Sequence, residues 1–156
     1  MKFSTPVFAN MIWAALFLEI RLLAIPIILA GLVIEYFFVR RLTGFGVKRS
    51  IFADVTMNAA SLLLGILLIP LAGIAWEFSA GTMLYEQFKI GSFSYVSWTA
   101  TFIMAVLINA VIENFVLRRI FKLEKNKAGF RWLCLANALS VGIALASFWF
   151  FPIKNS

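Results

Sequence analysis

The chain has 156 residues, of which 63% are hydrophobic and 13% are charged. This composition, with apolar runs of about 20 residues, excludes an ordinary soluble domain and predicts an all-α integral membrane protein. The net charge of +7 does not indicate nucleic-acid binding, because the basic residues are not interleaved with a stacking platform. The chain has no histidine, which removes the usual ligand of haem and zinc. Its single cysteine, Cys134, leaves the redox compartment open.

The first apolar region, residues 7–39, is too long for one membrane span. As a continuous helix it would extend ~50 Å at about 1.5 Å per residue, whereas the hydrocarbon core is ~30 Å thick. We therefore expect a short helix over 7–20, lying at the interface or projecting from the membrane, and a first span over 22–39. Pro26 lacks a backbone donor and is expected to kink this span.

The remaining spans are predicted at residues 53–76, 98–117 and 130–151. Asp54 is expected at the entrance of the second span, where a carboxylate favours a helix N-terminus. Residues 77–96 are nearly neutral, and their apolar positions predict a short interfacial helix. The prediction is thus a bundle of four transmembrane helices, with short interfacial helices before the first and third spans.

A nine-residue motif occurs twice. Residues 33–41 read VIEYFFVRR and residues 111–119 read VIENFVLRR, so six of the nine positions are identical at an offset of 78. An Asn-x-x-Ser motif follows each copy at an offset of 79, over 58–61 and 137–140. Identities at a nearly constant offset indicate a duplication.

We interpret the chain as a single transmembrane domain, residues 1–156, made of two tandem hairpin repeats over 7–76 and 85–152. The repeats run in the same direction, so they are expected to be parallel, with a pseudo-two-fold axis along the membrane normal. The connectors, 40–50 and 118–131, are strongly basic, which places both in the cytoplasm and both termini on the opposite side of a cell membrane. The expected topological anchors, which also suit anionic lipid headgroups, are Arg40, Arg41, Arg118 and Arg119.

Glu35 and Glu113 occupy the same place in the two motifs, roughly 7–8 Å deeper along the helix than the Arg pair. A carboxylate at that depth must be solvated, paired or protonated. Its own Arg pair lies at i+5 and i+6, whereas side chains on one helix pair at i+3 and i+4. We therefore expect each partner on the following helix, where Asn58 and Asn137 start the next spans at a similar depth.

These residues extend into a predicted intramembrane polar network. Asn109 lies one turn before Glu113 on the same helix face, while the equivalent position in the first repeat is Gly31. Ser61 and Ser140 share stripes with the two Asn residues, an arrangement typical of close helix packing or of a pore lining. The network is either structural, holding the hairpins in register, or functional, binding a proton or cation.

The sequence does not define an activity. Its small size and lack of catalytic motifs favour an accessory, scaffold or assembly subunit of a larger membrane complex, or a homo-oligomer. The alternative is a small oligomeric ion- or proton-coupled transporter or channel that uses the intramembrane glutamates. An enzyme is disfavoured because no nucleophile–base pair, metal-ligand cluster or phosphate loop is present, and no cofactor or metal is expected. Glu19 and Arg21 are expected at the outer interface, pairing with Glu77 or with lipid headgroups.

Overall fold

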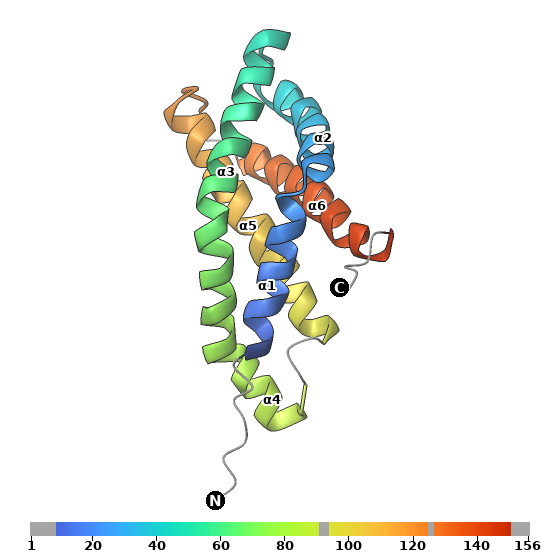
Figure 1. The fold of residues 1–156 in the computed structure, drawn as a ribbon. Coiled ribbons are helices and arrows are strands. Elements are labelled where there is room, and N and C mark those ends of the chain that lie inside the picture. Colours follow the sequence, from blue (N-terminus) through green and yellow to red (C-terminus); the bar gives the residue numbers. More distant parts are fainter. Residues whose placement is uncertain (1–8, 91–93, 125–126, 151–156) are drawn as a thin grey trace, which may run out of the picture.

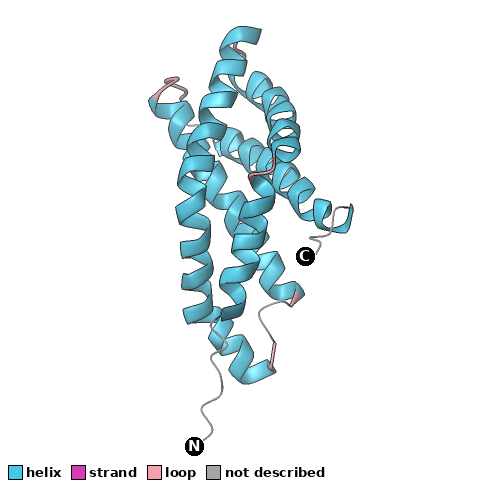
Figure 2. Ribbon diagram, viewed as in Figure 1, coloured by secondary structure: helices cyan, strands magenta, loops and turns pink. Residues whose placement is uncertain are grey.

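The structure is a computed structural model that describes residues 9–90, 94–124 and 127–150, and every regular element in these ranges is a helix (Figure 1; Figure 2). The elements in chain order are α1 Ala9–Leu22, α2 Ile25–Thr43, α3 Val47–Trp76, the π-helical turn η1 Glu77–Gly81, α4 Thr82–Phe88, α5 Tyr95–Arg119 and α6 Lys127–Phe150. Three helices are long and apolar enough to cross a membrane, or four if the bent pair α1–α2 forms one span. The predicted all-α class is confirmed. Both chain termini, residues 1–8 and 151–156, lie outside the described residues.

The chain bends by 75° between α1 and α2. A proline ring clashes with the carbonyl four residues earlier, which for Pro26 is that of Leu22, the last residue of α1. Ala24 is extended, with φ −69° and ψ 127°, and Pro26 falls in the first turn of α2, where its missing N–H costs nothing. The prediction that Pro26 kinks a span over 22–39 was therefore wrong, because the helix ends before the proline and a new helix starts there.

Helix α1 packs inside the bundle, against α3, α5 and α6. Ala14, Ala15 and Leu18 are fully buried in these contacts. The helix expected over 7–20 is present, but it neither projects from the bundle nor lies apart from it. The bend at residues 23–24 accounts for the difference, since it directs α1 back along α3 (Figure 1).

Helix α3 begins at Val47, six residues before the predicted start of the second span at 53. Asp54 therefore lies two turns inside α3, and its expected place at the helix N-terminus was wrong. The helical backbone continues through η1 into α4, whose Met83 and Phe88 are exposed. The short helix predicted within 77–96 is thus present, while its location at a membrane interface stays a prediction.

The remaining helices pack in two pairs that also cross-contact: α2 with α3 and α5 with α6, then α2 with α6 and α3 with α5. A buried cluster around Val39, Met57, Leu117 and Leu133 fills the space between them. The loop after α2 and the loop after α5 lie at one end of the bundle, where the rings of Phe45 and Phe121 are 6.3 Å apart (Figure 1). The polar residues predicted to form a network lie between this end and α1.

Candidate functional site

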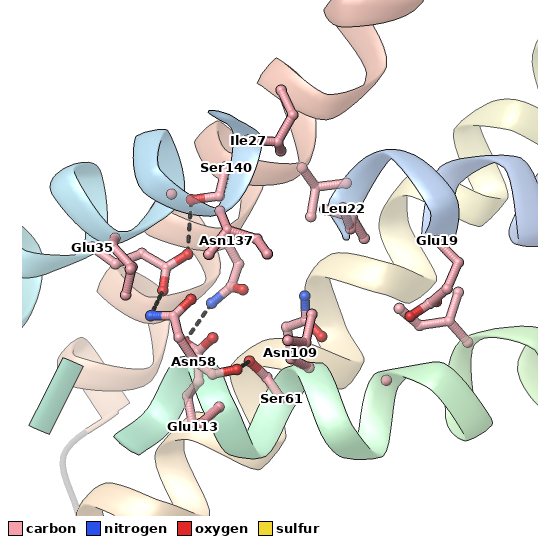
Figure 3. A pocket seen from close by; sticks show the side chains of 18 of the residues that line it. Glu19, Leu22, Ile27, Glu35, Asn58, Ser61, Asn109, Glu113, Asn137 and Ser140 are labelled. Atoms are coloured by element: carbon pink, nitrogen blue, oxygen red, sulfur yellow. Dashed lines mark hydrogen bonds between the residues drawn. The ribbon is translucent and has the colours of Figure 1, made fainter. Parts of the chain in front are cut away.

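The two motif glutamates are both buried, Glu35 on α2 with 3% of its surface exposed and Glu113 on α5 with 1%. The Asn58 amide Nδ2 donates to Glu35 Oε2 at 2.7 Å, and the Asn137 amide Nδ2 donates to Glu113 Oε2 at 2.6 Å (Figure 3). Each asparagine is on the helix that follows its glutamate, so the pairing expected from depth is present. Arg40, for comparison, contacts Tyr36, with 3.2 Å between Nη1 and the hydroxyl oxygen.

The two glutamates differ in the hydrogen bonding of their second carboxylate oxygen. The Ser140 hydroxyl on α6 donates to Glu35 Oε1 at 2.7 Å, so both oxygens of Glu35 accept hydrogen bonds. Ser61, at the corresponding position on α3, donates to the Asn58 backbone carbonyl at 3.1 Å instead. The Ser61 hydroxyl also lies near the Glu113 carboxylate. Glu113 Oε1 itself has no hydrogen-bond partner of good geometry among the described residues, and we refer to such an atom below as an open oxygen.

Gly31 lies beside this hydrogen bond. A methyl group at Gly31 would lie 3.6 Å from Ser140 Oγ and 3.9 Å from Glu35 Oε1, which are ordinary contact distances. The equivalent residue on α5 is Asn109, whose Oδ1 is also an open oxygen. The two halves therefore share the Glu–Asn pair but differ in the residue one turn before the glutamate.

Asp54 belongs to the same network. Asn58 Nδ2 lies 3.2 Å from Asp54 Oδ1 and 3.1 Å from the Asp54 carbonyl, in addition to its contact with Glu35. An amide nitrogen has two hydrogens, so Asn58 cannot donate to all three acceptors at once. Sequence reasoning missed this role by assigning Asp54 to a helix start. The four-residue spacing to Asn58, which puts both on one helix face, was the available signal.

All seven residues predicted to form the polar network line one pocket of about 230 Å³ between the helices (Figure 3). They are Glu35, Asn58, Ser61, Asn109, Glu113, Asn137 and Ser140. Apart from Glu19 and two glycines, the rest of the wall is aliphatic and includes Leu22 and Ile27, which flank the bend between α1 and α2. The pocket thus combines a polar floor with apolar sides, as ligand sites usually do.

Glu19 of α1 also lines this pocket, with 6% of its surface exposed and Oε2 as an open oxygen. Its expected place at the outer interface was wrong, because the bend after Leu22 packs α1 against the bundle. Arg21 lies on a different face, with its guanidinium carbon 4.8 Å from the centre of the Phe148 ring. Sequence reasoning missed Glu19 because it treated residues 7–20 as separate from the bundle.

The pocket has a strongly acidic character. Glu19, Glu35 and Glu113 line it and Asp54 lies beside it, all four buried, while none of the described lining residues is Lys or Arg. Within the described part of the chain, no group of three His, Cys, Asp or Glu side chains is arranged to hold a metal ion. The four predicted anchors are exposed and lie away from the pocket, at Arg40, Arg41, Arg118 and Arg119.

No protein-family model matches this chain, and neither the curated proteins nor the solved structures contain a match. The described residues form a helical protein with three to four helices long and apolar enough to span a membrane, and a carboxylate-lined pocket lies between these helices.

Proposed function

We propose that the protein is a small transporter that carries protons or small cations through the carboxylate pocket. The observation that carries this proposal is the open oxygen of Glu113, a side chain 1% exposed in a pocket whose described lining has no basic residue. A buried carboxylate without a counter-charge is costly, and a proton or a bound cation removes that cost. Asp54 is a further buried carboxylate of the same network.

The pocket favours transport over a purely structural role. A network that only holds helices in register is expected to satisfy its own hydrogen bonds, because each unsatisfied buried group reduces stability. Glu35 fits that description, since Asn58 and Ser140 occupy both of its oxygens. Glu113 does not. We therefore assign Glu35 to packing and Glu113 to ion binding.

The architecture supporting this function is, in our proposal, a parallel duplication. The cross-contacts of α2 with α6 and of α5 with α3 are what a pseudo-two-fold axis between the repeats 7–76 and 85–152 would produce. By the charge rule, the basic connectors 40–50 and 118–131 lie in the cytoplasm. Arg49 and Lys122 line a common hollow between these connectors, which supports contact with anionic lipid headgroups there.

Reconstitution tests this function. The purified protein is placed in vesicles, and fluxes of protons, sodium, potassium and the organic cation guanidinium are measured under an imposed gradient with a pH- or ion-sensitive dye or a radiolabel. We expect flux with the native protein, its loss in Glu113→Gln and its retention in Glu35→Gln, which removes the same charge from the same network. Equal loss in both variants would contradict the assigned roles. No flux under any gradient would reject transport and favour the accessory or scaffold subunit of a larger complex.

A further inference from the structure

The open oxygens in the pocket belong to three side chains, and all are acceptors. They are Glu19 Oε2, Asn109 Oδ1 and Glu113 Oε1. The two carboxylates are more than nine-tenths buried, so bulk water does not satisfy them. Buried acceptors in proteins are nearly always paired. Each of these acceptors therefore lacks a hydrogen-bond donor, and the pocket has more than one such acceptor.

The three acceptors lie along one wall. Asn109 is one turn before Glu113, so both side chains leave α5 on the same face. Glu19 approaches from α1: a methyl group at Gly65 would be 3.8 Å from Glu19 Oε1 and 3.8 Å from Asn109 Oδ1. Figure 3 shows Asn109 between the two glutamates. A ligand with a single donor at Glu113 would leave Asn109 and Glu19 without a donor, whereas a ligand with several N–H donors can supply more than one of these acceptors.

The size of the pocket and the chemistry of its wall further limit which ligands it can bind. A volume of about 230 Å³ is several times the ~30 Å³ that one water occupies in the liquid. Most of the other lining residues are aliphatic, and no aromatic side chain is among the described lining residues. Recognition of quaternary ammonium groups relies on aromatic faces. The pocket therefore suits a cation with N–H donors and a short apolar part.

We infer that the pocket binds a small organic cation carrying several N–H donors, a primary ammonium or a guanidinium. Glu113 and Glu19 accept its hydrogen bonds, its single positive charge offsets the charge of one carboxylate, and the Asn109 carbonyl oxygen accepts between them. The inference deepens the proposed function by naming the substrate class, and it rests on that function for the cation being carried across the membrane.

Isothermal titration calorimetry on the detergent-purified protein tests the inference. The probes are millimolar guanidinium and n-propylammonium, with tetramethylammonium and sodium as cations that carry no N–H donor. We expect the first two to bind and the other two not to bind. Affinity should fall about tenfold or more in Glu113→Gln and in Glu19→Gln, since each removes a charged acceptor. The loss should be smaller in Glu35→Gln, because both oxygens of Glu35 already accept hydrogen bonds from Asn58 and Ser140.

A second pair of variants tests the place of the ligand without removing a charge. Gly65→Ala puts a methyl group against Glu19 and Asn109, whereas Gly31→Ala puts one against Ser140 and Glu35; both meet their nearest atoms no closer than 3.5 Å, so both should fold. We expect weaker binding only in Gly65→Ala. Thermal unfolding of each variant without ligand shows whether it is folded.

Several results would overturn the inference. These are equal binding of tetramethylammonium, binding of sodium alone, no binding of any probe to folded native protein, or equal losses in Glu35→Gln and Glu113→Gln. Proton flux in vesicles without N–H cation binding would reject the substrate class and leave transport standing. Binding of guanidinium or n-propylammonium without flux would reject transport and leave the binding site standing.

Discussion

The hydrogen bond from Ser140 to Glu35 joins α6 to α2, and its removal is a sharp test of the packing role assigned to Glu35. Ser140→Ala deletes the donor 2.7 Å from Glu35 Oε1 and leaves that oxygen open in a side chain 3% exposed. A hydrogen bond to a charged group contributes ~1.5–3 kcal/mol, and pairs inside membrane proteins average ~0.6 with a maximum near ~1.7. We expect a loss of about 1–2 kcal/mol in the free energy of unfolding.

Ser61→Ala is the matched control, because Ser61 occupies the corresponding place on α3 and donates to a backbone carbonyl at 3.1 Å. That carbonyl keeps its place in the helix, so the loss should be about 0.5 kcal/mol or less. Reversible unfolding in mixed micelles measures both values, and a double-mutant cycle of Ser140→Ala with Glu35→Gln isolates the pairwise term. Equal losses in the two serine variants, or a cycle with no coupling, would refute the packing role.

Three further predictions concern the helices around the pocket and their orientation in the membrane. Gly44 ends α2 with φ +67°, so Gly44→Ala should lower stability by about 1 kcal/mol, whereas Gly46→Ala, at φ −63°, should not; thermal unfolding compares them. Pro26→Ala removes the ring clash that ends α1 and should straighten the 75° bend between α1 and α2. Distances between spin labels on α1 and α2 should then become longer. An unchanged distance would mean that packing sets the bend. In a Cys134→Ala background, a cysteine replacing Lys48 should resist an impermeant thiol reagent added outside intact cells, and rapid labelling would reverse the proposed topology.

The long helices and the two Glu–Asn pairs were predictable because the sequence patterns that indicate them are local. Apolar length located the long helices, and the duplicated motif drew attention to Glu35 and Glu113. Their depth relative to the Arg pair, together with the i+3 and i+4 rule, moved the expected partner to the asparagine of the next helix. Both asparagine bonds are present in the structure, at 2.7 and 2.6 Å.

What escaped prediction depends on how helices turn and pack. The Pro26 ring was expected to kink the first span, but α1 ends just before it. The resulting bend packs α1, and with it Glu19, against the other helices. Asp54 was assigned to a helix start because the first two turns of α3 read as a connector. The contrast between Glu35 and Glu113 rests on Ser140, which reaches α2 from 105 residues away, and no local pattern carries such a contact.

Glu113 has an open carboxylate oxygen, whereas both oxygens of Glu35 accept hydrogen bonds. A hydrophobic carbodiimide, which reacts with carboxyl groups it can reach inside a membrane protein, tests this directly when the modified residue is identified by mass spectrometry. We predict modification at Glu113, protection of Glu113 by guanidinium or n-propylammonium, and no reaction at Glu35 on the same timescale. Modification at Glu35 in preference to Glu113 would contradict the account.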